Sequence, residues 1–133
     1  MSESLSLAGI KIMVIDDSNT IRRSAEIFLG KAGAQVILAE DGFDALAKIA
    51  DHRPDLIFCD ILMPRLDGYQ TCAMIKKSAR FGDTPVVMLS SKDGLFDRAR
   101  GRLVGCDRYL TKPFTKDSLL RTVSDLTRRA EHA

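Results

Sequence analysis

Continuous apolar runs that stop at polar residues constrain the fold of this chain most strongly. The clearest run, Leu56 to Cys59, ends at Asp60 and is followed by Met63-Pro64 and Asp67-Gly68. An apolar run without alternation is typical of a strand buried on both faces, as in parallel sheets. Open α/β sheets bind ligands at the carboxyl ends of such strands, so Asp60 is predicted to be a site residue.

The segments between these runs have the spacing of amphipathic helices. One of them stops at Gly33 and repeats apolar residues at the period of a helix, at Ile21, Ala25, Phe28 and Leu29. We predict strands at 10–15, 35–39, 56–59, 85–89 and 108–110, each followed by a helix. Strands alternating with helices imply a parallel sheet, with right-handed crossovers that place helices on both faces. The expected fold is therefore α/β, a doubly wound five-stranded parallel sheet with five helices in a three-layer sandwich.

Apolar stripes indicate which face each helix buries. The helix that follows Asp41-Gly42 is expected to bury one face made of Phe43, Leu46, Ala47 and Ala50. The segment from Gly94 to Val104 has only a thin stripe, made of Leu95, Ala99 and Leu103, and is expected to be marginally packed. The last helix is expected to begin at a Thr115 cap and to bury Leu119, Leu120, Val123 and Leu126.

The chain is long and apolar enough for one compact domain. With 133 residues, 45% of them hydrophobic, it can build a core without disulfide bonds or structural metal. We expect a short flexible segment over 1–9, one domain over 10–128 and a tail over 129–133, with no output domain. The 3 cysteines lack metal-ligand spacing, and their odd number fits reduced thiols in the cytoplasm.

Composition argues against two classes of partner. The formal net charge is only +2 and the basic residues form no long run, so nucleic-acid binding has no support. No apolar stretch approaches the roughly 18 residues that span a bilayer, so membrane insertion is not expected. The composition thus predicts a cytoplasmic protein.

Polar residues with complementary chemistry follow the predicted strands. They are Asp16 and Asp17 after the first, Asp60 after the third, Ser90 after the fourth and Lys112 after the fifth. Because parallel strands bring their carboxyl ends to one edge, these residues are expected to converge. Grouped carboxylates repel one another unless a cation neutralises them, and Mg²⁺ is the hard cation that binds both carboxylate and phosphate oxygens. Asp60 is then a candidate phosphoryl acceptor, with Lys112 and Ser90 binding the phosphoryl oxygens.

These residues, in this order and spacing, closely resemble the receiver domain of two-component response regulators. The match rests on the following motifs and spans about residues 10–128: Asp16-Asp17, Asp60 with Met63-Pro64 and Asp67-Gly68, Ser90, and Lys112-Pro113-Phe114. The resemblance implies the flavodoxin-like, CheY-like strand order 2-1-3-4-5. It also implies a binding module rather than an enzyme, with only self-phosphorylation from small donors and self-dephosphorylation. Such a module would be a monomer or weak dimer that acts through protein contacts.

The resemblance assigns roles in phosphoryl transfer. A histidine kinase would donate its phosphoryl group to Asp60. Asp17 and Asp60 would hold Mg²⁺ directly, Asp16 would act largely through water, and Leu62 would contribute its backbone carbonyl. The Lys112-Pro113 peptide bond is expected to be cis, which would aim Lys112 at the phosphoryl group.

The resemblance also assigns roles in switching. Phosphorylation would move Ser90 and shift Tyr109 inward, which would reshape the face built by the fourth helix, the fifth strand and the fifth helix for a protein effector. Leu62 and Lys92 lie where a side chain can orient the attacking water. Neither is a good general base, so self-dephosphorylation is not expected to be accelerated.

Within the receivers, the segments 15–23 and 60–68 most resemble regulators of twitching motility in type IV pilus chemosensory systems. A flagellar chemotaxis-type receiver, or one of other output, shares most of these residues and is the first alternative. A Mg²⁺-dependent phosphohydrolase would need a general acid where this chain has Ser18. A flavin-binding, flavodoxin-like protein is a third class, but here Asp16-Asp17 would repel the phosphate of the flavin. A fourth alternative is a degenerate receiver that works without phosphate, but no key residue of the receiver motifs is missing here.

Overall fold

The computed structural model describes residues 6–91 and 98–131. The strands are β1 (Lys11–Ile15), β2 (Gln35–Ala39), β3 (Leu56–Asp60), β4 (Val86–Ser91) and β5 (Arg108–Lys112). The helices are α1 (Asn19–Lys31), α2 (Gly42–His52), α3 (Gly68–Lys77), α4 (Arg98–Val104) and α5 (Lys116–Glu131). All neighbouring strands are parallel, and the sheet order is β2-β1-β3-β4-β5. The predicted fold class and strand order are therefore confirmed.

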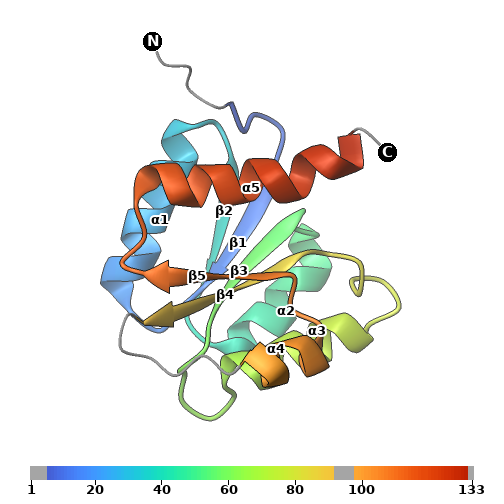
Figure 1. Cartoon of the computed structure of the whole chain (residues 1–133). Helices are drawn as coiled ribbons and strands as arrows, with labels where there is room; N and C mark the ends of the chain where they lie inside the picture. The colour runs from blue at the N-terminus through green and yellow to red at the C-terminus, as the bar shows by residue number, and fades with distance from the viewer. Residues whose placement is uncertain (1–5, 92–97, 132–133) are drawn as a thin grey trace.

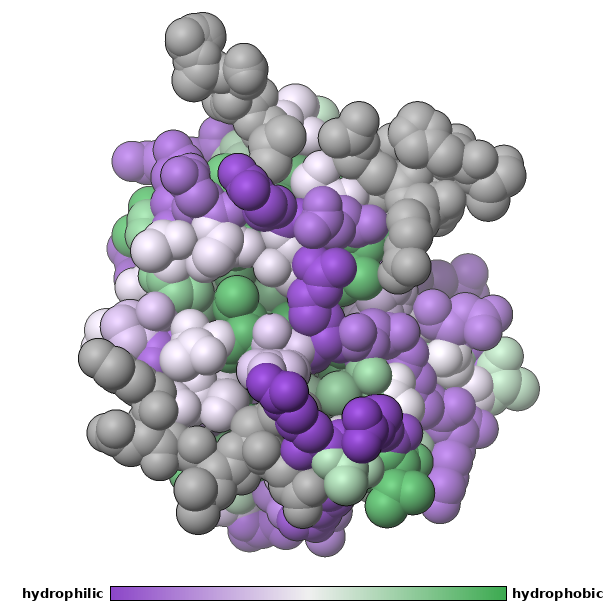
Figure 2. All heavy atoms as spheres, viewed as in Figure 1, coloured by the Kyte–Doolittle hydropathy of each residue, from purple (hydrophilic) through white to green (hydrophobic). Residues whose placement is uncertain are grey.

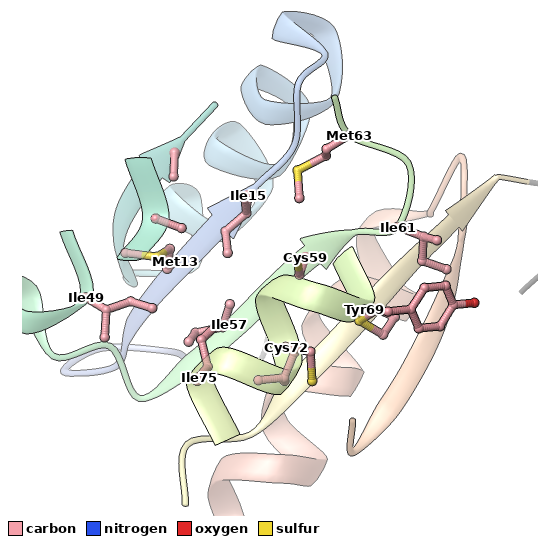
Figure 3. Close-up of a cluster of buried hydrophobic side chains, with 14 of the residues drawn as sticks. Met13, Ile15, Ile49, Ile57, Cys59, Ile61, Met63, Tyr69, Cys72 and Ile75 are labelled. Carbon is pink, nitrogen blue, oxygen red and sulfur yellow. The ribbon is translucent and has the colours of Figure 1, made fainter. Parts of the chain in front are cut away.

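The sheet separates two apolar cores, with α1 and α5 on one face and α2, α3 and α4 on the other (Figure 1). Alternate residues of β1 serve different cores, since Ile12 and Val14 pack with α1 and α5 while Met13 and Ile15 pack toward α2 and α3. Figure 3 shows the second core, where side chains from β1 and β3 meet those from α2 and α3. All residues of β3 are buried, as expected for a central parallel strand.

Short polar side chains start the helices that lead away from the strand ends. Ser18 caps α1 by accepting a hydrogen bond from the Ile21 N–H at 3.3 Å. Asp41 caps α2, and Asp67 caps α3 in a capping box with Gln70. These caps satisfy first-turn N–H groups that have no partner inside the helix. The caps thus fix where α1, α2 and α3 begin after the ends of β1, β2 and β3.

The predicted buried face of α2 is wrong for three of its four residues, since only Leu46 packs partly against the core. Phe43, with 51% of its surface exposed, and Ala47 and Ala50 face solvent, whereas the buried residues are Gly42, Ala45 and Ile49. The reason is a close approach at Gly42, where a Cβ atom would lie 2.4 Å from Thr71 Oγ1 and 2.7 Å from Leu66 Cδ2. Gly42 must face α3, and this turns Phe43 outward, where the Arg65 guanidinium lies 5.2 Å from its ring centroid.

The predicted buried stripe of the fourth helix is also wrong in its described part. Ala99 is exposed and Leu103 is 86% exposed, whereas Gly101 is buried and Val104 packs partly against the core. Leu95 lies outside the described residues. The helix ends at Gly105, whose φ of +87° suits glycine, and the Cys106 N–H donates to the Gly101 carbonyl at 3.0 Å. Gly101 is thus the only buried residue of α4, with Val104 partly buried beside it.

The remaining helix predictions hold more closely. Ala25 and Leu29 of α1 are buried, and α5 buries the predicted set of Leu119, Leu120, Val123 and Leu126. The Thr115 hydroxyl accepts from the Ser118 N–H at 3.0 Å and so caps α5. In the described part of the chain, no helix is both long and apolar enough to span a bilayer.

Candidate functional site

The candidate site lies where β1, β3, β4 and β5 end. Parallel pairing places Ile15 beside Cys59 and Asp60 beside Leu89, so the ends of these strands lie at one edge of the sheet. Asp60 is the last residue of β3, and Lys112 is the last residue of β5. Parallel pairing therefore brings residues that are far apart in the sequence close together, as predicted from the strand pattern.

Three carboxylates meet at this edge. One side-chain oxygen from each of Asp16, Asp17 and Asp60 lies within 4.8 Å of the others. Asp16 is fully buried and Asp60 is 4% exposed, whereas Asp17 is open to solvent. Such a group, half buried and half open, suits a hard divalent cation that keeps part of its water shell.

Lys112 is the cation that the protein itself supplies to this cluster. Its Nζ lies 3.0 Å from Asp60 Oδ1 and 3.2 Å from Asp16 Oδ2. The Lys112-Pro113 peptide bond is cis. One ammonium group against three carboxylates leaves the cluster negative by about two charges, which fits a divalent ion.

The surroundings shift the pKa values of both Asp60 and Lys112. Burial, followed by the negative charge of Asp16, raises the pKa of Asp60 to about 6, although Lys112 acts in the opposite direction. Burial lowers the pKa of Lys112, but the Asp60 hydrogen bond and the charges of Asp16 and Asp60 outweigh it, so that pKa is raised. Lys112 therefore stays protonated at neutral pH, while Asp60 is mostly ionised.

The other predicted site residues occupy different surroundings. Ser90 is 6% exposed, and its hydroxyl donates to the Ser91 carbonyl at 3.3 Å. The Leu62 side chain is 71% exposed on the loop that follows β3. Tyr109 lies on β5 and its hydroxyl accepts a hydrogen bond from Arg98 of α4, so it points toward α4. Lys92 lies outside the described residues.

Asp16 accepts two hydrogen bonds that the sequence did not predict, one through its side chain and one through its backbone carbonyl. The Ser18 N–H donates to Asp16 Oδ1 at 2.9 Å, and the Arg22 guanidinium donates to the Asp16 carbonyl oxygen. Arg22 is a missed site residue. Its position on the first turn after the acidic pair was the only available signal, because the contact depends on how α1 leaves the sheet.

Gly68 explains why the motif after Asp60 ends in glycine. A Cβ atom there would lie 2.3 Å from the Asp60 carbonyl oxygen and 2.7 Å from the Ile61 Cα. The Gly68 N–H donates to the Ile61 carbonyl at 2.8 Å, which closes the loop between them. The loop thus folds back on the end of β3, with Gly68 packed directly against the Asp60 and Ile61 backbone.

The sequence profile described as "Response regulator receiver domain" matches residues 12–124. The chain is 68% identical over 115 residues to Protein PilG of Pseudomonas aeruginosa, which covers 86% of this chain and 85% of PilG. It is 38% identical over 120 residues to Response regulator MprA of Mycobacterium sp. (strain KMS). That alignment covers 90% of this chain but only 51% of MprA, so the chain spans about half the length of this relative.

Solved structures show the same fold. The chemotaxis protein CheY4 of Vibrio cholerae has a TM-score of 0.84 and 33% identity, over 90% of this chain and 99% of CheY4. The signal receiver domain of a signal transduction histidine kinase from Syntrophus aciditrophicus has a TM-score of 0.85 and 29% identity. It covers 94% of this chain and 95% of its own. The sequence and structural comparisons agree in the family to which they point.

Proposed function

The chain belongs to the response regulator receiver family, and we propose that it accepts a phosphoryl group on Asp60 from a histidine kinase. The observation that carries the proposal is the placement of Asp60. It ends β3 within 4.8 Å of the Asp16 and Asp17 carboxylates, with Lys112 Nζ 3.0 Å from its Oδ1. A buried carboxylate suits nucleophilic attack on phosphorus when one oxygen is hydrogen-bonded, here to Lys112, and the other is left to attack.

The proposed transfer forms a bond between an Asp60 carboxylate oxygen and phosphorus. The bond between phosphorus and the kinase imidazole breaks, and the imidazole nitrogen keeps that electron pair. Lys112 holds Asp60 Oδ1, so Oδ2 is the oxygen positioned to attack. Lys112 also places a positive charge beside the new phosphoryl oxygens, where charge stabilisation is the main contribution a protein makes. Asp60 must be ionised to attack, and its pKa of about 6 permits this at neutral pH.

The carboxylates fit Mg²⁺ as the cofactor, which would neutralise charge between the acidic cluster and the phosphoryl oxygens. Both oxygens of Asp16 already bind within the protein, to the Ser18 N–H and to Lys112. This supports an Asp16 role through water. Asp17 is exposed and carries no hydrogen bond or ion pair among the described residues, which supports direct ligation by Asp17 and Asp60. The Leu62 backbone carbonyl is the proposed further ligand.

The proposed output is protein binding rather than turnover of a substrate. Ser90 and Tyr109 are the proposed switch residues, and the face formed by α4, β5 and α5 is the proposed effector surface. An added phosphoryl group makes contacts in one conformation that it lacks in the other, and so shifts an equilibrium between the two. The weak packing of α4 through Gly101 suits an element that changes position.

Twitching-motility control in the cytoplasm is the biological setting that we propose. The support is the 68% identity to PilG over most of both chains. A flagellar chemotaxis-type role is the second candidate, supported by the structural likeness to CheY4. A phosphohydrolase fits less well, because Ser18 occupies the position of its general acid and serves as the cap of α1.

Intact-mass spectrometry after incubation with acetyl phosphate and Mg²⁺ tests the transfer directly. One phosphoryl adduct is expected on the wild-type chain and on Asp51→Asn, a control that removes an exposed carboxylate away from the site. The adduct should be absent from Asp60→Asn and in the presence of a chelator. Failure to label the wild type, under conditions that label another receiver, would favour a receiver that works without phosphate.

A further inference from the structure

The loop that joins β3 to α3, residues 61–67, contains a strained turn at Arg65. The backbone φ of Arg65 is +68°, in the left-handed region that favours glycine. The Leu66 N–H donates to the Pro64 carbonyl at 2.7 Å, so the chain turns tightly around Arg65. A three-residue turn with a positive φ at its centre is rare and strained. Other contacts have to offset this strain, and the Arg65 side chain makes two of them.

The Arg65 side chain connects this turn to the beginning of α2. Arg65 Nη2 lies 2.9 Å from Asp41 Oδ2, and the guanidinium lies 5.2 Å from the ring centroid of Phe43. The Asp41 side chain is only 16% exposed, and its Oδ1 accepts a hydrogen bond from the Asp44 N–H at 2.7 Å as the cap of α2. Both partners of Arg65 thus lie at the beginning of a regular helix. We call Arg65, Asp41 and Phe43 the loop clamp.

The loop clamp lies at the surface of the domain. The loop after β3 reaches the lower edge of the view in Figure 1, and mostly hydrophilic side chains line that edge in Figure 2. The Arg65 side chain is 65% exposed and Phe43 is 51% exposed. Exposed ion pairs and cation–π contacts are individually weak, so the loop clamp adds little to the stability of the whole domain. Contacts of this strength are nevertheless enough to change the populations of alternative loop positions.

The same loop carries a ligand proposed for Mg²⁺. Leu62, which would bind the ion through its backbone carbonyl, lies two residues after Asp60 and three before Arg65. No described residue donates a hydrogen bond to the Leu62 carbonyl, so this oxygen is free to bind an ion. The hydrogen bond from the Gly68 N–H to the Ile61 carbonyl holds the base of the loop. The loop clamp holds the outer turn, and together these contacts limit how far the Leu62 carbonyl can move.

We infer that Arg65 is a positioning residue for the Mg²⁺ site, and that it acts by holding the loop against α2 before the ion binds. This inference rests on the proposed function, in which Asp17, Asp60 and the Leu62 carbonyl bind Mg²⁺. A ligand that is already held in place loses less conformational entropy on binding, so the loop clamp should raise the affinity for the ion. A structural role alone would change the stability of the domain and leave the affinity for Mg²⁺ unaltered.

Urea denaturation at a series of Mg²⁺ concentrations tests the inference, because the stabilisation at each concentration gives the Kd of the folded state for the ion. Arg65→Asn removes the loop clamp, and asparagine adopts a positive φ more readily than arginine, so stability without Mg²⁺ should change little. The Kd for Mg²⁺ should rise about threefold, in the range of an exposed ion pair with a cation–π contact. Electrostatics alone predicts the opposite sign, because removing a cation from the loop after Asp60 favours binding of Mg²⁺.

Two further variants serve as controls. Arg53→Asn is the matched one, because Arg53 is also an exposed arginine with a positive φ, at +49°. It precedes β3 and so lies at the opposite end of this strand from Asp60, and its replacement should leave the Kd for Mg²⁺ unchanged. Arg65→Lys keeps a cation that can reach Asp41 and the Phe43 ring, so its Kd should lie between those of the wild type and Arg65→Asn.

Three outcomes would overturn the inference. A Kd for Mg²⁺ in Arg65→Asn that is equal to or below that of the wild type would leave the Mg²⁺ site intact and rule out positioning by Arg65. An equal rise in Arg53→Asn would indicate a general effect of losing an exposed arginine. Absence of any stabilisation of the wild type by Mg²⁺ would overturn the Mg²⁺ site of the proposed function together with this inference.

Discussion

Arg100 of α4 reaches across to Asp67, the residue that caps α3, with 3.5 Å between its guanidinium nitrogen and Asp67 Oδ2. The same guanidinium lies 4.3 Å from the ring centroid of Tyr69. Asp67 ends the loop that begins directly after Asp60, and Gly68 closes that loop on the Ile61 carbonyl. Arg100 therefore connects the loop after Asp60, the proposed phosphoryl acceptor, to the helix that forms part of the proposed effector surface.

Replacing Arg100 by alanine should loosen α4 while barely changing global stability. The ion pair is exposed and the ring contact is partly exposed, so the loss in unfolding free energy should be about 1 kcal/mol or less. Amide hydrogen exchange of α4 residues should nevertheless accelerate, because Gly101 is the only buried residue of this helix. Arg102→Ala on the same helix is the control, and equal acceleration by both would refute a special role for Arg100.

Gly68→Ala should destabilise the domain by roughly 1–3 kcal/mol, since its Cβ would lie 2.3 Å from a backbone oxygen. Gly30→Ala is the matched control. A Cβ there meets nothing within 4 Å, and alanine favours the helix, so a gain of about 0.5–1 kcal/mol is expected. Urea denaturation of the two variants measures both effects. Equal stability of the two variants would contradict the close approach at Gly68.

The strand ends and their acidic cluster were predictable because each depends on local chain properties. A continuous apolar run indicates a buried parallel strand, and parallel strands bring residues such as Asp16, Asp60 and Lys112 to one edge. The strand order needed more than periodicity. It came from the resemblance to receiver domains and is confirmed by the sheet.

Features that depend on contacts between elements were not predictable in the same way. Phe43 and Leu103 continue apolar stripes that the sequence assigns to buried faces, yet both lie in solvent. In α2 the orientation follows from the close approach of Gly42 to Thr71, and in α4 it follows from the burial of Gly101. A glycine that permits contact has no apolar signature, so a periodicity argument assigns the helix face to its larger neighbours.

The raised pKa of Asp60 predicts that the metal-free chain loses stability as pH rises. The folded carboxyl has a pKa of about 6 against 3.8 as its ordinary value, so the folded state binds more protons between these values. Its contribution to stability is therefore present below about pH 4 and is lost as pH rises through about 6. Asp60→Asn removes this loss, so its advantage over wild type should be about 2 kcal/mol larger near pH 7.5 than near pH 4.5.

Urea denaturation with chelator at both pH values measures this difference. Adding Mg²⁺ at the higher pH should reduce the advantage of Asp60→Asn, because the ion stabilises the wild-type carboxylates by binding the folded state. A stability advantage of Asp60→Asn that is the same at both pH values would show that burial and Asp16 do not raise the pKa of Asp60 in the folded state. An advantage unchanged by Mg²⁺ would argue against ligation by Asp60.

Leu62→Asn should shorten the lifetime of the phosphoryl group on Asp60. Leu62 lies two residues after Asp60 and is 71% exposed, so the change should not disturb folding, while an amide could orient the attacking water. The expected shortening is about tenfold, below the roughly 100-fold minimum that a positioned general base contributes. The measurement is loss of the mass adduct after removal of acetyl phosphate. Leu103→Asn makes the same change at an 86% exposed site on α4 and should leave the lifetime unaltered, whereas an unaltered lifetime in Leu62→Asn would refute the role of this position.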